Sequence, residues 1–272
     1  MSRYKNIATT LLCGWALFMT QAVIAASETA DTDLSPLRFH VVFNNVPYKP
    51  GLETDWGFAC LIEGLDKTVL FDTGGNGAVL LSNMQKLGLN AGAVEAVVLS
   101  HIHHDHTGGL DALLAHNSDI TVYLPESFPL AFRQEILQQG AAAEIVSGPR
   151  QLLDRLHSTG EMGGAVREQA LIVDSTAGLI IITGCAHPDV ADMAERAQRY
   201  LAKPIYLLMG GFHLGGSSHA RIEAIIARLK ALGVNKVAPS HCTGEKATAL
   251  FREAWGNDFV EGGLGVVFEL PR

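Results

Sequence analysis

The sequence predicts an α/β fold of the α+β type, with strands and helices alternating along one domain. Short apolar, β-branched runs predict the strands, and longer segments with a 3.6-residue apolar period between them predict the helices. Antiparallel hairpins are expected near the start of each half, at 58–62 with 68–71 and at 171–173 with 179–183. This order fits two similar α/β halves that face each other.

The other expected elements follow from the same patterns. An alternating strand at 37–43 opens the domain, and Asp72-Thr73-Gly74-Gly75 ends the first hairpin. Further strands are predicted at 96–99, 120–124, 205–209 and 236–239, and helices at 79–87, 128–139, 190–201, 217–232 and 245–255. The segment 147–169 is rich in glycine and weakly periodic, so we expect a binding loop or a surface excursion there.

The N-terminus has the pattern of a secretory signal peptide over 1–26. A basic start precedes an apolar run over 7–24, and small residues follow it at once. Cleavage after Ala25 or Ala26 would leave 27–272 as a single domain in the periplasm or outside the cell. A membrane anchor is the alternative, because about 18 apolar residues nearly span a bilayer. No basic stop-transfer cluster follows, so we expect no stable membrane association after cleavage.

The charge balance and the cysteines narrow the class of protein. The net charge of −8 argues against nucleic acid as an electrostatically steered partner, and we expect a small-molecule substrate instead. Three cysteines remain after signal cleavage, an odd number that does not make a complete disulfide framework. Cys60 lies in an apolar run and is expected in the core. Cys185 and Cys242 each neighbour a candidate ligand histidine, and we favour packing behind the ligands over direct metal contact for both.

The most informative segment is 101–106, where four histidines and one carboxylate occupy six consecutive positions. So many imidazole rings are hard to explain by packing, because each buried ring needs hydrogen-bond partners. His101 and His103 are two positions apart, so both rings can reach one side of an extended turn. Asp105 and His106 then suit a second metal about 3.5–4 Å away. The turn therefore favours a metal site, and we expect divalent ions there, zinc with manganese or iron as alternatives.

This motif resembles the signature of the metallo-β-lactamase superfamily. The resemblance implies a four-layer αββα sandwich and a hydrolytic site with two metal ions. Two further histidines follow predicted strands, in the order that the superfamily requires. The resemblance therefore implies that His187 completes the first metal site with His101 and His103. It implies in the same way that His241 completes the second site with Asp105 and His106.

One branch of the superfamily matches more closely. Its blocks are similar to Gly184-Cys185-Ala186-His187-Pro188, Gly210-Gly211-Phe212-His213-Leu214 and Pro239-Ser240-His241-Cys242-Thr243-Gly244. This branch is the family of the 7,8-dihydropterin-6-methyl-4-(β-D-ribofuranosyl)aminobenzene-5'-phosphate synthase. Most of the superfamily carries a bridging aspartate near Gly210, and this sequence has none there. We interpret His213 as a substrate-binding or acid group, or as an additional ligand, with a structural histidine as the alternative.

These observations predict a metal-dependent hydrolase that directs a metal-bound hydroxide at an ester, lactone, amide or phosphoester in the periplasm. The expected catalytic residues are Asp105, which would orient the hydroxide while ligating the second metal, and His213. Asp72 is expected to fix the turn through hydrogen bonds to the ligands. A transferase resembling the synthase is one alternative, disfavoured by export. A non-catalytic metal-binding protein is the other, disfavoured by the complete ligand sets.

Overall fold

The computed structural model describes residues 36–270, together with Met1. Residues 36–270 fall within one compact unit. Of the predicted signal peptide, only Met1 is among the described residues, and the predicted cleavage site lies outside them. In the described part of the chain, no helix combines the length and the apolar character needed to cross a membrane.

The first half of the domain contributes most of a seven-stranded sheet in the order β15-β1-β2-β3-β4-β5-β6. Strands β1 to β3 and β15 pair antiparallel, and β3 to β6 run parallel. The strands are β1 (Leu37–Asn44), β2 (Phe58–Glu63), β3 (Val69–Phe71), β4 (Ala96–Val98), β5 (Thr121–Pro125), β6 (Ala142–Val146) and β15 (Val267–Leu270). The parallel strands matter for function, because their carboxyl ends share one edge of the sheet.

The second half forms a six-stranded sheet in the order β14-β13-β12-β11-β8-β7, in which β12, β13 and β14 run parallel. Its strands are β7 (Arg150–Leu153), β8 (Leu156–Ser158), β11 (Leu171–Ser175), β12 (Gly178–Thr183), β13 (Ile205–Gly211) and β14 (Lys236–Ser240). A separate two-stranded ribbon joins β9 (Met162–Gly163) to β10 (Arg167–Glu168).

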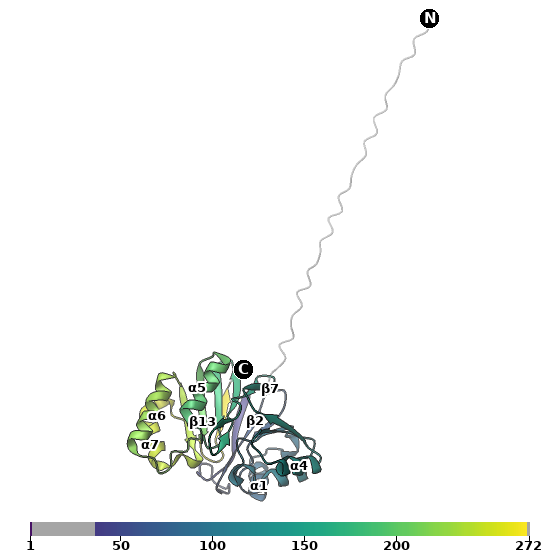
Figure 1. Cartoon of the computed structure of the whole chain (residues 1–272), viewed down its shortest axis with the longest axis horizontal. Helices are drawn as coiled ribbons and strands as arrows, with labels where there is room; N and C mark the ends of the chain where they lie inside the picture. The colour runs from purple at the N-terminus through teal and green to yellow at the C-terminus, as the bar shows by residue number, and fades with distance from the viewer. Residues whose placement is uncertain (2–35, 271–272) are drawn as a thin grey trace. The chain divides into compact units, whose positions relative to one another are not determined.

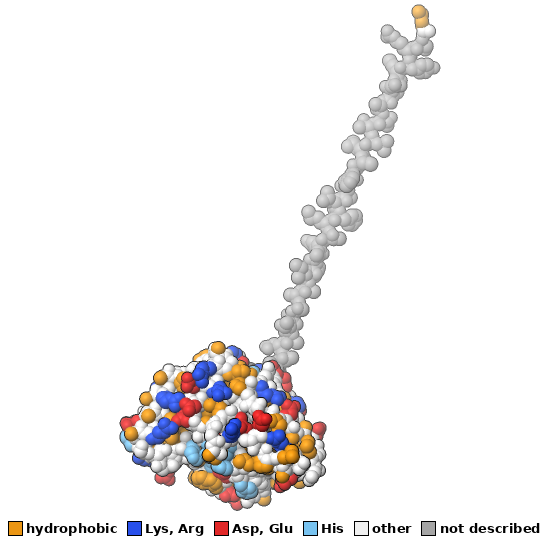
Figure 2. Space-filling model, in the orientation of Figure 1, with side chains coloured by type: hydrophobic (Ala, Val, Ile, Leu, Met, Phe, Trp, Pro, Cys, Tyr) orange, Lys and Arg blue, Asp and Glu red, His pale blue; other side chains and the backbone are white. Residues whose placement is uncertain are grey.

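Helices cover the outer face of each sheet, and Figure 1 shows α1 and α4 on one side of the molecule and α5 to α7 on the other. The α-helices are α1 (Gly77–Lys86), α2 (His104–Thr107), α3 (Leu110–His116), α4 (Leu130–Gln138), α5 (Val190–Leu201), α6 (His219–Ala231) and α7 (Glu245–Trp255). Short 3-10 helices lie at η1 (Ala91–Ala93), η2 (His241–Thr243) and η3 (Gly256–Asp258). On the face shown in Figure 2, acidic and basic side chains are interspersed.

Three buried apolar clusters separate four layers. The central cluster joins the inner faces of the two sheets, for example Phe39 and Phe71 with Ile180 and Ile182. A second cluster packs α1 and α3 on the outer face of the seven-stranded sheet, and a third packs α5 to α7 on the outer face of the other sheet. Because each sheet buries both faces, inner strands such as β3, β4 and β12 are buried along their whole length, whereas the edge strand β15 alternates between buried and exposed residues. The expected four-layer αββα sandwich is confirmed.

Most predicted elements are confirmed to within two or three residues. Both hairpins pair antiparallel, with Cys60 opposite Phe71 in the first. Helix α1 starts two residues earlier than expected, because the Asn76 side chain accepts hydrogen bonds from the amides of Ala78 and Val79. The expectation of a loop at 147–169 was wrong, since this segment carries β7 to β10. Those strands are two to four residues long, too short to show a period.

Candidate metal centre

The predicted ligands lie at the carboxyl ends of parallel strands from both sheets. The turn 101–106 follows β4, and α2 starts within it at His104. His187 follows β12 and His213 follows β13, while His241 begins the 3-10 helix directly after β14. The two sheets bring these ends together, because the ring centroids of His101 and His187 lie 4.6 Å apart and those of His106 and His241 lie 5.1 Å apart.

The strand ends of the two sheets come together because the backbone at the end of β12 packs closely against the histidine turn. A Cβ atom at Gly184 would collide with Oγ of Ser100 and lie 2.9 Å from Oδ2 of Asp72, so only glycine lets the end of β12 approach the histidine turn. His213 and His241 both adopt a positive φ, at 51° and 50°. Non-glycine residues rarely occupy this region, and such strain is typical of functional sites held in place by their surroundings.

The first cluster, called here the three-histidine group, consists of His101, His103 and His187. One donor atom from each lies within 4.8 Å of the others. Nε2 of His101 lies 3.1 Å from Nδ1 of His103, so two ring nitrogens point into the same space. Burial, the largest influence, lowers the pKa of His101 to about 2, which keeps the ring neutral and able to donate a lone pair to a metal.

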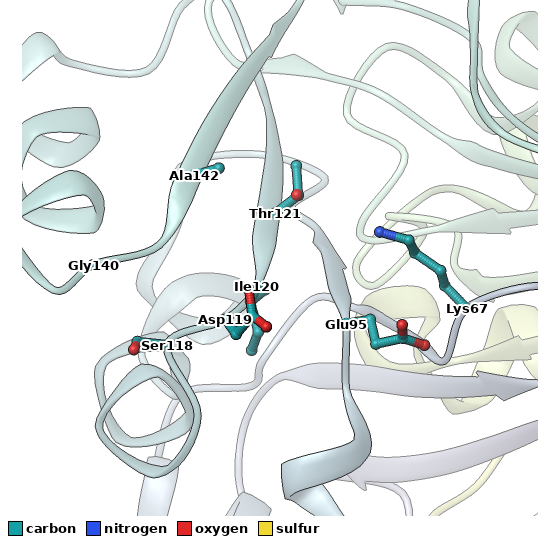
Figure 3. A pocket seen from close by; sticks show the side chains of 8 residues that line it. All are labelled: Lys67, Glu95, Ser118, Asp119, Ile120, Thr121, Gly140 and Ala142. Carbon is teal, nitrogen blue, oxygen red and sulfur yellow. The ribbon is translucent and has the colours of Figure 1, made fainter.

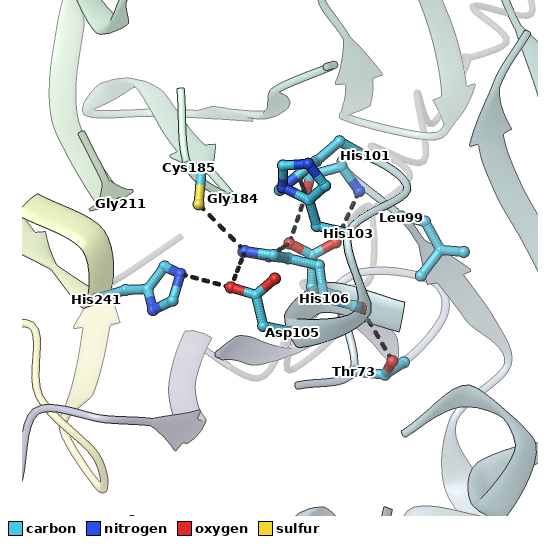
Figure 4. A network of polar contacts seen from close by, with 12 residues as sticks. Thr73, Leu99, His101, His103, Asp105, His106, Gly184, Cys185, Gly211 and His241 are labelled. Carbon is cyan, nitrogen blue, oxygen red and sulfur yellow. Dashed lines mark hydrogen bonds and ion pairs between the residues drawn. The ribbon is translucent and has the colours of Figure 1, made fainter. Parts of the chain in front are cut away.

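The second cluster, called here the Asp105 group, consists of Asp105, His106, Cys185 and His241, again with donor atoms within 4.8 Å of one another. Oδ2 of Asp105 lies 3.5 Å from Nε2 of His106 and 3.3 Å from Nε2 of His241. Sγ of Cys185 lies 3.3 Å from Nε2 of His106, as Figure 4 shows. The structure therefore brings all six predicted ligands into two groups and adds the sulfur of Cys185.

Four of the five histidines in these groups are held from behind by an acceptor on Nδ1, which turns Nε2 toward the other donors. The pairs are His101 with Oγ of Ser100 at 2.9 Å, His106 with Asp72 at 2.7 Å, His187 with Glu168 at 2.9 Å, and His241 with Asn45 at 2.7 Å. Such partners fix the tautomer and the ring orientation of metal-ligating histidines. The role expected for Asp72 agrees with this geometry, since the same carboxylate also accepts from the amide and the hydroxyl of Ser100.

Glu168 is the site residue that sequence reasoning missed. Its fully buried carboxylate accepts hydrogen bonds from the amides of Gly184, Cys185, Ala186 and His187, at 2.8–3.1 Å. Burial, the largest influence, would raise the pKa of Glu168, but the hydrogen bonds from His187 and these amides outweigh it and hold the pKa at about 2. Nothing local in the sequence distinguishes Glu168 from Glu161 in the same segment, because its partners lie on the turn after β12.

The electrostatics of the Asp105 group favour a bound cation. His106 lies between the carboxylates of Asp72 and Asp105, which raise its pKa to about 10 although burial, the largest influence, opposes them. The contacts from His106 and His241 also hold the pKa of Asp105 well below its usual range, against the effect of its own burial. Nε2 of His241 is buried without a hydrogen-bond partner. A metal ion would occupy that nitrogen and balance the carboxylates.

His213 lies beside the three-histidine group rather than inside it. Its ring centroid is 4.3 Å from that of His187, and its donor atom forms a third cluster with those of Cys185 and His187. The side chain is exposed, and contact with Cys242 raises the pKa of His213. Its expected part as an acid or substrate-binding group stays a prediction.

Two hollows adjoin the donor groups. The larger, of about 550 Å³, lies against His241 and Cys242, and the smaller, of about 180 Å³, against His187 and His213. Figure 3 shows a third hollow, of about 230 Å³, between Lys67, Glu95 and the first residues of β5 and β6. This third hollow lies at the amino ends of the parallel strands, and none of the predicted site residues lines it. Ligands of α/β sheets bind at the opposite ends, so it is not the candidate site.

Comparisons with known proteins agree with this geometry. The sequence profile of the metallo-beta-lactamase superfamily matches residues 57–184. A Methanocaldococcus jannaschii protein named 7,8-dihydropterin-6-methyl-4-(beta-D-ribofuranosyl)-aminobenzene-5'-phosphate synthase is 29% identical over 252 residues, covering 75% of this chain and 86% of the relative. Among solved structures, Tm1679, described as a metal-dependent hydrolase of the beta-lactamase superfamily, gives a TM-score of 0.75 at 27% identity, over 87% of this chain and 100% of that one.

A more distant structural neighbour shares the fold alone. The short form of human tRNase Z gives a TM-score of 0.60 at 15% identity, over 86% of this chain and 100% of that one.

Proposed function

The chain belongs to the metallo-β-lactamase superfamily, and from that premise we propose that it is a metal-dependent hydrolase of a small-molecule ester, lactone, amide or phosphoester. The observation that carries the proposal is the pair of donor groups, in which four imidazole rings are turned inward by acceptors behind them. A polar loop that was merely rich in histidine would not need a separate acceptor for each ring.

The residues present fit two divalent ions. His101, His103 and His187 would hold one, and Asp105, His106 and His241 would hold the other, with Cys185 as a further donor. Nitrogen, oxygen and sulfur donors in this mixture suit zinc, and manganese or iron are the alternatives. Ions bound there would supply Lewis acidity and lower the pKa of a water molecule toward neutrality.

Each of the protein side chains has a distinct role in the proposed reaction. Asp105 is 21% exposed, so its carboxylate can face the donor group and also accept a hydrogen bond from the attacking water. His213 stands at the rim, where its ring can hydrogen-bond to the substrate or give a proton to the leaving group. Glu168 orients the ring of His187, and Asp72 orients the ring of His106; neither carboxylate touches the substrate.

The competing function is the group transfer named for the M. jannaschii relative. Two points favour hydrolysis: Tm1679, which matches over more of the chain, is described as a hydrolase, and the N-terminus has the pattern of an export signal. We propose that the mature protein acts in the periplasm. Cell fractionation followed by N-terminal sequencing should give a periplasmic form that begins at Ala26 or Ser27. An intact Met1 in the soluble cytoplasm would instead favour the transferase.

The experiment that tests the hydrolase uses metal-replete mature protein and a panel of p-nitrophenyl esters, phosphodiesters, lactones and β-lactams. We expect turnover of at least one class, and loss of that turnover in His103→Ala. A protein that binds two metal ions and hydrolyses none of these classes, but catalyses the transfer, would overturn the proposal.

A further inference from the structure

The hollow beside His241 has features of a substrate pocket. Its volume of about 550 Å³ lies within the range of ordinary small-molecule sites, about 300–1,000 Å³. Its lining includes Tyr48 and Trp56 from the chain between β1 and β2, and Thr248 and Ala249 from α7. His241 and Cys242 lie at the end of the hollow nearest the metal ligands.

The wall between β1 and β2 is unusually apolar for a surface. Val46, Tyr48 and Trp56 are 37%, 57% and 56% exposed, and all three line this hollow. They are three of the nine large hydrophobic side chains that are exposed in the described part of the chain. Single exposed apolar residues need no explanation, but several together in a concave site mark a binding surface.

The position of Trp56 connects this wall to the Asp105 group. Its ring centroid lies 4.9 Å from that of His241, with the rings tilted by 54°. Nε2 of His241 in turn lies 3.3 Å from Oδ2 of Asp105. An apolar group packed on Trp56 would therefore hold the attached bond close to the Asp105 group.

Away from the metal ligands, the side-chain charges along the hollow do not suit a negatively charged group. Arg252 is the one Lys or Arg among the residues that line it, and its two terminal nitrogens pair with Glu261 at 2.7 and 3.1 Å. Glu245 also lines the hollow and adds a second carboxylate. Away from the metal ligands at its His241 end, the hollow would offer a phosphate group two carboxylates and no unpaired lysine or arginine, whereas phosphate sites normally present free arginine or lysine.

We infer that this hollow binds the aromatic or alkyl part of an uncharged carboxylic ester, packed between Tyr48, Trp56 and α7. The inference rests on the proposed hydrolase and narrows its substrate class, because it disfavours phosphorylated compounds. In the reaction water adds to the ester carbonyl and the C–O bond to the alcohol breaks, so the products are a carboxylic acid and an alcohol. No further reactant is needed.

The test combines kinetics with a binding measurement that needs no turnover. For p-nitrophenyl acetate, butyrate, hexanoate and phenylacetate, kcat/KM should rise by about 10- to 100-fold with the size of the apolar group. Tyr48→Ala should raise KM for hexanoate and phenylacetate by about 10-fold, with little change for acetate and in kcat. Leu137→Ala, which removes an exposed apolar side chain of α4 outside the hollow, is the matched control and should leave these values unchanged.

Binding of 4-phenylbutan-2-one, an uncharged ketone with no hydrolysable bond, is measured by calorimetry on the metal-loaded wild-type, Tyr48→Ala and Trp56→Ala proteins. Weaker binding in both variants supports the inference even if no ester is turned over, which separates it from the proposed hydrolase. If kcat/KM for the esters depends neither on acyl length nor on Tyr48, the inference is overturned while the proposed hydrolase stands. On the metal-free protein, where phosphate has no metal ion to bind, binding of phenyl phosphate as tight as that of the ketone would overturn it too.

Discussion

Oε2 of Glu168 lies 2.9 Å from both Nδ1 and the backbone nitrogen of His187, so one buried carboxylate fixes the ring and the chain of the same ligand. Its other oxygen, Oε1, accepts from the three amides before His187. Glu168 thereby shapes the whole turn that presents Cys185 and His187 to the two donor groups.

Glu168→Gln should weaken metal binding at the three-histidine group by about 10- to 100-fold, because an amide replaces the anion that orients His187. Calorimetric titration of the metal-free protein measures the change. Glu144→Gln, which removes a carboxylate of an exposed ion pair with Arg150, is the control and should bind metal as the wild type does. Equal affinity in all three proteins would show that Glu168 does not position His187.

Cys185→Ser should remove a charge-transfer band from the cobalt-substituted protein, because a thiolate ligand to cobalt gives such a band in the near ultraviolet. Binding would release the thiol proton to solvent. Cys242→Ser is the matched control: its Sγ points to the backbone oxygen of Cys185, at 3.6 Å, and lies outside the Asp105 group. A band that survives Cys185→Ser would remove Cys185 from the ligand set.

Asp105→Asn should lower kcat by about 10²–10⁴ with little change in KM, because it removes a charge that orients the attacking water mainly in the transition state. Asp72→Asn should lower kcat by about 10- to 100-fold, since Asp72 acts only through His106 and Ser100. Both are measured by steady-state kinetics on a confirmed substrate. Near wild-type turnover by Asp105→Asn would show that Asp105 does not orient the attacking water, and His213 would be the next residue to test.

The histidine turn could be predicted because its information is local. Four rings and a carboxylate in six positions, directly after a buried strand, leave few explanations other than a metal site. His187 and His241 needed the resemblance to a family, since one histidine after a strand is commonly structural. The strands and helices could be predicted from strong periodicity, and their arrangement in four layers from the resemblance to the family.

Glu168 could not be predicted, and the sequence did not show that the sulfur of Cys185 faces the Asp105 group, for a different physical reason. Glu168 meets its partners 16 to 19 residues further along the chain, through a turn in which Ala186 takes a φ of 62°. That turn also sets the direction of the Cys185 side chain, which no periodicity encodes. The strands at 147–169 were missed because each is only two to four residues long, too short for an alternating pattern to show.

Metal content per chain tests the central claim most directly. Elemental analysis of the mature protein, expressed with ample metal and purified gently, should give about two transition-metal ions per chain. His103→Ala should give about one, with an unchanged far-ultraviolet circular dichroism spectrum, because this ligand lies on a turn above an independent core. Two ions in the wild type and one in the variant would support two separate sites. A wild-type protein that carries none would contradict the account.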